Sequence, residues 1–288
     1  MSDTQFGFSV ADWSAAASTY AEIGDRAERV TTPCGEGKMV WRIWGRGAPL
    51  VLVHGGAGSW SHWIRNIPAF EGDRMVIAPD LPGLGESDMP PVPYSPESIA
   101  AIVAEGITEL LSPGARFDMA GFSFGGMISS IVAGLLGDRV RTETIMGGSG
   151  LGGKFGNLKP TVKLPLSGTE EEMYAAHKHN LLAFMIEDPA KLDALALYTQ
   201  GQNAPRTRIR SPEHATSEKA LVALRKATAR LNSLWGEYDI IRPYFDHRRD
   251  LLAEICPEAE FHIISGAGHW VQYEAADEVN SHLRRFIT

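Results

Sequence analysis

The stretch Phe117-Asp118-Met119-Ala120-Gly121-Phe122-Ser123-Phe124-Gly125-Gly126 decides the fold of this chain. Its apolar start predicts a short buried strand, and the apolar run at 127–136 predicts a helix after it. Gly-x-Ser-x-Gly between a strand and a helix is typical of a nucleophile elbow, where glycines let the backbone pass closely. The flanking strand and helix disfavour the alternative, a chance match within a loop. We therefore expect the Ser123 hydroxyl to stand clear at a helix N-terminus, where N–H groups favour negative charge.

The segments around this stretch follow a repeating strand–helix order. Continuous apolar runs predict buried strands at 49–53, 75–78, 140–146, 231–235 and 260–264. Capping residues and apolar periodicity predict helices at 95–111, 243–255 and 274–286. An antiparallel hairpin is predicted from 28–32 and 38–44, with a turn at 33–37. This order predicts an α/β fold with a mostly parallel, doubly wound sheet.

Two regions depart from that order. Residues 1–25 form an N-terminal extension with a helical pattern, and Trp13 and Tyr20 are its candidate contacts if it packs on the domain and does not fray. Residues 151–215 contain no strand pattern, and capping residues there predict helices opening at Thr169, Asp188 and Ser211. We interpret 151–215 as a helical lid inserted into an α/β core formed by 26–150 and 216–288.

Composition narrows the class of partner. The 288 residues carry a formal net charge of −8 and contain no long basic run, which argues against nucleic acid or an anionic membrane. We expect a small-molecule substrate and leave a homodimer open. Two distant cysteines suggest a reducing compartment, and the sequence shows neither a signal peptide nor an 18-residue apolar run, so we expect a cytoplasmic protein. The spacing of His177 and His179 is poor for shared ligation on a helix, and no metal or cofactor is expected.

A serine hydroxyl needs a base to become nucleophilic, and the base needs an acid that orients it. His269 follows the strand predicted at 260–264, and Asp239 follows the one at 231–235. Both therefore fall with Ser123 at the carboxyl ends of strands, where open α/β sheets bind ligands. Glu237 is the rival acid, and Asp239 has the alternative role of a helix cap.

Two further elements of an acyl-transfer site can be placed. The oxyanion of a tetrahedral intermediate needs N–H donors, which we assign to the backbone of Phe124 and of Gly56 in the loop after the strand at 49–53; the alternative for that loop is a tight turn alone. Aromatic residues beside these loops predict an apolar substrate site, with Trp60, Phe122 and Trp270 as binding residues. Apolar residues of the predicted lid would complete it: Met173, Leu181, Phe184 and Met185.

Taken in order, the His-Gly-Gly loop at 54–56, Asp80-Leu81-Pro82-Gly83-Leu84-Gly85, the Ser123 elbow, Asp239 and Gly268-His269 resemble the α/β-hydrolase superfamily. The resemblance covers about residues 26–288. It implies the fold and a serine hydrolase in which Ser123, His269 and Asp239 act through an acyl-enzyme on a small carboxylic ester. It says little of the substrate, because one fold carries many activities.

Two segments, 269–274 and 146–152, are similar to the meta-cleavage-product hydrolases, which break a carbon–carbon bond in dienoate diketones. That subfamily usually carries Asn before the serine, where this chain has Phe122, and its lid arginine has no clear counterpart. The basic candidates for that arginine are Arg206, Arg208 and Arg210. Ester hydrolysis is therefore our first hypothesis and C–C hydrolysis the second. A non-catalytic ligand-binding protein is the third, while dehalogenases and epoxide hydrolases need a carboxylate nucleophile where Ser123 stands.

Overall fold

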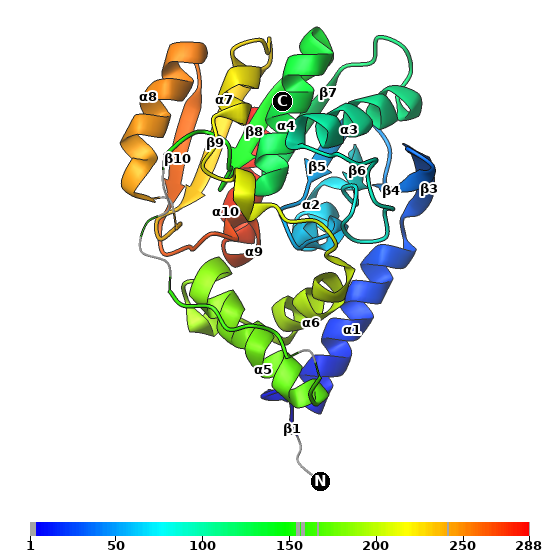
Figure 1. Cartoon of the computed structure of the whole chain (residues 1–288), viewed down its shortest axis with the longest axis vertical. Coiled ribbons are helices and arrows are strands. Elements are labelled where there is room, and N and C mark those ends of the chain that lie inside the picture. Colours follow the sequence, from blue (N-terminus) through cyan, green and yellow to red (C-terminus); the bar gives the residue numbers. More distant parts are fainter. Residues whose placement is uncertain (1–3, 154–155, 157–158, 166, 241, 288) are drawn as a thin grey trace.

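The computed structural model describes residues 4–287 except 154–155, 157–158, 166 and 241, and it contains an eight-stranded sheet (Figure 1). The strand order is β10-β9-β8-β7-β5-β6-β4-β3. The strands are β3 (Glu28–Cys34), β4 (Gly37–Trp44), β5 (Ala48–Val53), β6 (Arg74–Pro79), β7 (Phe117–Phe122), β8 (Val140–Met146), β9 (Arg230–Gly236) and β10 (Glu260–Ile264). All pairs from β10 to β6 are parallel, and β4 pairs antiparallel with β6 and β3. The predicted mostly parallel sheet and N-terminal hairpin are confirmed.

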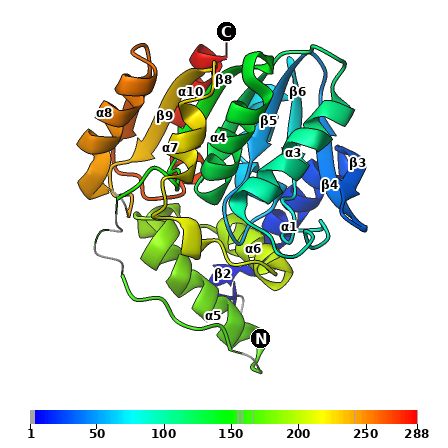
Figure 2. The ribbon, with the colours of Figure 1, turned by 45° about the horizontal axis from the view of Figure 1, so that its top comes forward.

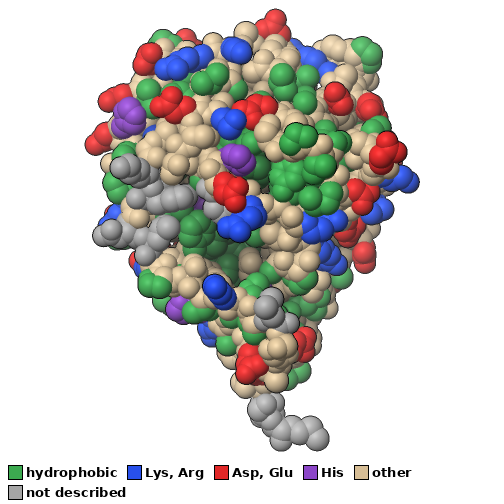
Figure 3. Space-filling view, viewed as in Figure 1, with side chains coloured by type: hydrophobic (Ala, Val, Ile, Leu, Met, Phe, Trp, Pro, Cys, Tyr) green, Lys and Arg blue, Asp and Glu red, His purple; other side chains and the backbone are tan. Residues whose placement is uncertain are grey.

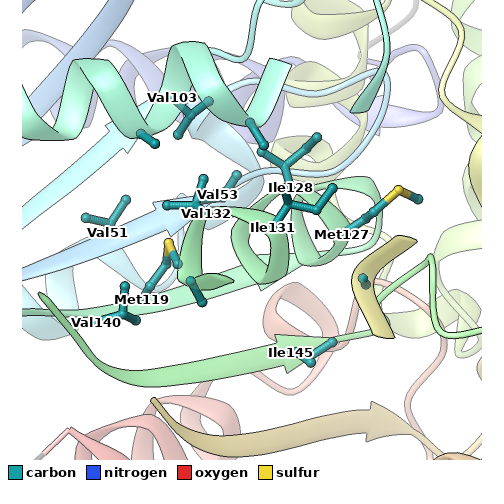
Figure 4. Close-up of a cluster of buried hydrophobic side chains, with 14 of the residues drawn as sticks. Val51, Val53, Val103, Met119, Met127, Ile128, Ile131, Val132, Val140 and Ile145 are labelled. Atoms are coloured by element: carbon teal, nitrogen blue, oxygen red, sulfur yellow. The ribbon is translucent and has the colours of Figure 1, made fainter. Parts of the chain in front are cut away.

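The sheet is covered on both faces, which explains the continuous apolar strands. In β5, Val51 and Val53 enter one buried cluster while Leu50 and Leu52 enter the other. The first cluster packs under α3 (Pro96–Leu110), α4 (Phe124–Leu136), α7 (Lys219–Leu224) and α8 (Phe245–Ile255); Figure 4 shows part of it. The second packs under α1 (Val10–Asp25), α2 (Ile67–Phe70), α9 (Val271–Glu274) and α10 (Ala276–Phe286). Each parallel strand is therefore fixed from both sides before it reaches its carboxyl end.

In the 151–215 region the described helical segments begin at Glu170, and α5 and α6 lie beyond one end of the sheet (Figures 1 and 2). The segments are α5 (Glu170–Asn180), the π-helical turn η3 (Leu181–Met185) and α6 (Ala194–Asn203). Thr169 opens α5 as predicted, through a capping box in which its hydroxyl accepts from Glu172 N and the Glu172 carboxylate accepts from Thr169 N.

Two predicted helix starts are wrong. Asp188-Pro189 opens only the three-residue 3-10 turn η4 (Pro189–Lys191), and Ser211-Pro212 only η6 (Pro212–His214). After η4 the backbone becomes extended at Leu192, whose side chain enters the second buried cluster and so ends the turn. The next helix, α6, begins after Asp193, whose carboxylate caps Ala196 N at 2.9 Å.

The N-terminal extension packs on the rest of the chain. Trp13 in α1 lies edge-on against Tyr174 of α5 and Tyr198 of α6, with ring centroids 4.9 and 5.4 Å apart. Tyr20 lies against Trp60 at 5.1 Å. The helix therefore contacts both the 151–215 segment and the loop after β5.

Two further observations concern the apolarity of the helices and the distribution of charged side chains on the surface. No helix among the described residues is long and apolar enough to cross a bilayer. Acidic and basic side chains are interspersed on the face shown in Figure 3 and do not gather by sign.

Candidate active site

The predicted strand–turn–helix around Ser123 is present. β7 ends at Phe122, α4 begins at Phe124, and Ser123 between them has φ of +53°, a left-handed value that non-glycine residues rarely adopt. A Cβ at Gly121 would lie 2.1 Å from Ser129 Oγ, and one at Gly125 would lie 2.3 Å from His54 O. Both glycines are therefore needed for close packing of strand, helix and neighbouring loop.

The structure brings Ser123, His269 and Asp239 together. His269 Nε2 lies 3.0 Å from Ser123 Oγ, and its Nδ1 lies 2.8 Å from Asp239 Oδ2. An ionised carboxylate can only accept, so Nδ1 carries the proton and Nε2 is left to accept from the serine hydroxyl. His269 and Asp239 are only 3% and 1% exposed, so water screens their interaction little.

Hydrogen bonds fix the loop that carries His269 and join it to the loop that carries Asp239. Gly268 N donates to Glu274 Oε2 at 2.7 Å, and Trp270 N donates to Met185 O at 2.7 Å, which fixes the backbone on both sides of His269. The rival acid, Glu237, accepts from Ser265 Oγ and Gly266 N at the surface. Asp239 is thus the carboxylate within reach of the imidazole.

Gly147 lies beside the contact between His269 and Asp239, and its lack of a side chain leaves space for these two groups. It follows β8 with φ of +53°, and a Cβ there would lie 3.0 Å from the His269 ring and 3.1 Å from Asp239 Oδ2. A side chain at this position would press on both groups.

The two predicted oxyanion donors face the same cavity as Ser123. Gly56 and Phe124 both line it, and among the described residues neither backbone N–H donates a hydrogen bond. Gly55 N, by contrast, donates to His62 Nδ1 at 3.3 Å. Of the two loop glycines, Gly56 is therefore the one with a donor to offer.

The cavity above Ser123 has a volume of about 540 Å³. Phe122 lines it as predicted, and so do Leu181, Phe184 and Met185 of the 151–215 segment. Met173 does not appear in its wall. Four other residues predicted for the site do not line this cavity: Trp60, Trp270, Arg206 and Arg208.

We expect Trp60 and Trp270 at the substrate site, but neither of them lines this cavity. The Trp60 ring turns toward the sheet and packs on Trp44 at 5.6 Å, away from the cavity. Trp270 is fully buried, stacks on Tyr273 at 4.2 Å and donates its Nε1–H to His62 O. Both indoles fill the second buried cluster, because burying so large an apolar surface outweighs exposing it in the cavity.

Several wall residues were missed by sequence reasoning. They include His62, Asn180, Gln200, Ile209 and Arg248. His62 belongs to the same loop as Gly56, which is the one available signal. Burial holds the pKa of His62 well below its ordinary range, helped by the nearby His54 and His269, so its ring is neutral.

The three arginines considered as counterparts of the lid arginine point in different directions. Arg208 donates to Ser87 O and Arg206 donates to Gln202 O, so neither faces the cavity. Arg210 lines the cavity, but its side chain is 84% exposed and pairs with Glu213. Among the described residues no cluster of three His, Cys, Asp or Glu side chains is arranged to hold a metal.

A mostly parallel sheet with a serine at a strand-to-helix turn, beside a histidine and an aspartate from later strand ends, defines an α/β hydrolase. Residues 48–276 match the alpha/beta hydrolase fold family, and the chain belongs to that family.

Two known proteins are similar to this chain over most of its length. It is 31% identical over 281 residues to the dihydrolipoyllysine-residue acetyltransferase component of the acetoin cleaving system of Pseudomonas putida, covering 93% of this chain and 68% of that one. It is 30% identical over 254 residues to a 2-hydroxy-6-oxo-6-phenylhexa-2,4-dienoate hydrolase of Burkholderia cepacia, covering 82% and 86%. The similarity to meta-cleavage-product hydrolases is thereby confirmed.

Solved structures share the fold. An esterase of Rhodococcus sp. ECU1013 superposes with a TM-score of 0.75 at 22% identity, covering 91% of this chain and 98% of that one. The meta-cleavage product hydrolase of Pseudomonas fluorescens IP01 gives 0.71 at 23% identity, covering 89% and 96%. At this identity the likeness speaks for the fold alone.

Proposed function

We propose that this chain is a serine hydrolase that cleaves a small carboxylic ester or related acyl substrate through an acyl-enzyme. The observation that carries the proposal is the continuous contact from Ser123 Oγ to His269 Nε2 at 3.0 Å and from His269 Nδ1 to Asp239 Oδ2 at 2.8 Å. Nucleophile, base and orienting acid are within hydrogen-bond reach without any rearrangement.

The reaction follows from that geometry. Ser123 Oγ bonds to the carbonyl carbon while its proton passes to His269 Nε2, and Asp239 stabilises the resulting imidazolium. The carbonyl oxygen becomes an oxyanion, which the N–H groups of Phe124 and Gly56 stabilise. The bond to the leaving oxygen then breaks, and that oxygen takes the proton from Nε2. Water repeats the sequence on the acyl-enzyme, releases the acid and restores the serine.

The cavity supports an apolar substrate of modest size. Its volume of about 540 Å³ lies in the range of small-molecule sites, and Phe122, Phe184, Met185 and Ile209 give it apolar walls. Since three of its wall residues come from η3, we treat the 151–215 segment as a lid over the site within this proposal.

Carbon–carbon hydrolysis is the second candidate, favoured by the 30% identity to a dienoate hydrolase. The same serine, histidine and aspartate would act on a vinylogous diketone. Phe122 beside the nucleophile is apolar, Arg210 is solvent-exposed, and Arg248 in the wall already donates to two backbone carbonyls. These residues offer little to a dienoate carboxylate, so the ester remains the leading substrate.

The test compares the wild type and Ser123→Ala on short p-nitrophenyl esters and on a meta-ring-fission product. We expect the wild type to turn over the esters and Ser123→Ala to lose ~10⁴-fold or more in kcat. Ser265→Ala, which removes an exposed hydroxyl from the His269 loop, is the matched control and should keep its rate. Turnover of the ring-fission product alone would favour the second candidate. A wild-type Ser123 that resists a fluorophosphonate probe would favour a ligand-binding protein without catalysis.

A further inference from the structure

Arg248 is a buried cation whose hydrogen-bond partners are uncharged. It lies on the sheet-facing side of α8, is 2% exposed, and places its guanidinium over the Trp235 ring at 5.1 Å. Nη1 donates to Gly148 O and Nη2 to Gly152 O, each at 2.9 Å. Among the described residues no carboxylate forms an ion pair with it, and its Nε has no acceptor. Burial lowers the pKa of Arg248 to about 10, so it stays charged at neutral pH. Burying a charge in this way is costly, and the neighbourhood must account for it.

The two carbonyls that Arg248 holds bracket a turn beneath the nucleophile. Between Gly148 and Gly152, Ser149 donates from its backbone N and from its hydroxyl to Ser123 O, at 3.1 and 3.2 Å. Ser123 sits at a strained φ, so its carbonyl needs fixed partners to keep the hydroxyl aimed. Arg248 therefore acts on the position of Ser123 through one intervening turn.

The same turn joins the two ends of the 151–215 segment. Gly150 N donates to Ala215 O at 3.0 Å, and Gly152 N donates to Ser217 O at 2.9 Å. Ala220 N donates back to Gly150 O at 2.9 Å. The guanidinium that holds Gly152 O thus also fixes the place where this segment leaves the core.

The charge of Arg248 also reaches the acid of the site. Its guanidinium and the Asp239 carboxylate attract each other, although they form no direct pair. Gly147, one residue before the turn, packs against both Asp239 and His269. The guanidinium is therefore a fixed positive charge near the acid of the site. Among the described residues, other charged or titratable groups near this turn and the Asp239–His269 contact are His62 in the cavity wall, Tyr244 against Gly153, Glu274 under Gly268, and Lys159, Glu187, Tyr238 and Arg242 on the opposite side.

We propose that Arg248 is a positioning residue for the proposed hydrolysis: it locks the 148–152 turn under Ser123 and places a fixed positive charge beside Asp239. The inference rests on the proposed function, and it assigns Arg248 no contact with the reacting atoms. A merely structural arginine would affect stability alone. If Arg248 is a positioning residue, it must also affect the rate at which Ser123 reacts and the pH dependence of that rate.

The experiment measures the rate constant for fluorophosphonate labelling of Ser123 between pH 5 and 9, which needs no knowledge of the natural substrate. Arg248→Gln removes the charge and retains an amide donor, whereas Arg248→Lys retains the charge. Arg249→Met is the matched control, because Arg249 is the next residue of α8, is half-exposed and pairs with Asp246.

We expect Arg248→Gln to lower the labelling rate by about tenfold, since small displacements of a nucleophile are costly. The midpoint of the acidic limb of its pH profile should rise by about half a pH unit, because a nearby positive charge is lost. Arg248→Lys should keep the midpoint and recover part of the rate, and Arg249→Met should match the wild type.

Each outcome decides one point. A wild-type midpoint and rate in Arg248→Gln overturn the inference while leaving the proposed function intact. A midpoint that shifts equally in Arg248→Lys also overturns it, because the charge would then be irrelevant. A wild type that takes up no probe refutes the proposed function, and the inference falls with it. If Arg248→Gln fails to fold, the profile of Arg248→Lys against Arg249→Met decides, with an unshifted midpoint and a reduced rate as the supporting result.

Discussion

Replacing Asp239 by Asn tests the centre of the proposed site. The Asp239 carboxylate accepts the His269 Nδ1 proton at 2.8 Å in a place that is 1% exposed. An amide at this position can present its NH2 group instead, which favours the imidazole tautomer with the proton on Nε2. That tautomer cannot accept the proton of Ser123. We expect kcat for p-nitrophenyl butyrate to fall ~10³–10⁴-fold, which corresponds to about 4–5 kcal/mol of lost transition-state stabilisation.

The matched control is Glu237→Gln, two residues earlier on the same loop. Glu237 is a surface carboxylate that bonds Ser265 and Gly266, so its loss should change kcat by less than about twofold. Melting temperatures of both variants show whether either change acts through unfolding. The reasoning is refuted if Asp239→Asn retains a tenth of the wild-type kcat while folded, or if Glu237→Gln loses as much as Asp239→Asn.

Two further predictions concern stability. Burial raises the pKa of Glu143 from 4.5 to about 8, so the unfolded chain releases this proton at lower pH than the folded chain, and stability present below pH 4.5 is lost as the pH rises toward 8. Urea unfolding should show the wild type about 2–3 kcal/mol less stable at pH 7.5 than at pH 5.5 through this group, a difference that Glu143→Gln removes; an equal pH dependence in the variant would exclude Glu143 as its source. Trp13→Ala should cost about 3 kcal/mol, because the ring is buried against Phe6, Tyr174 and Tyr198, and an unchanged unfolding midpoint would show that α1 is not a stabilising part of the fold.

The parts of the site that sequence predicted are those fixed by local covalent geometry. Gly121 and Gly125 are required because any side chain there meets backbone or a neighbouring hydroxyl, so the turn at Ser123 is written in five residues. Asp239 and His269 follow strands, and parallel strands bring their carboxyl ends to one edge whatever the loops do. The order of the parallel strands therefore predicts these positions independently of side-chain packing.

Side-chain direction and distant partners could not be predicted in this way. Trp60 and Trp270 lie on the right loops, but competition between cavity and core decided where their rings point. Asp188 caps a 3-10 turn with the same chemistry that would cap a helix. Arg248 finds its two carbonyl partners 100 and 96 residues earlier in the chain, a distance that no local pattern bridges.

The hydrogen bonds that tie Gly150 to Ala215 and Gly152 to Ser217 have a consequence for how such a chain diversifies. They hold Ala215 and Ser217 beside the 148–152 turn, so the two ends of the segment leave and rejoin the core at one place. A helical segment of different length and composition could be grafted there, provided that it keeps an acceptor for Trp270 N, which Met185 O supplies here. Under the proposed function, exchange of this one segment would then alter substrate preference in a single evolutionary or engineered step.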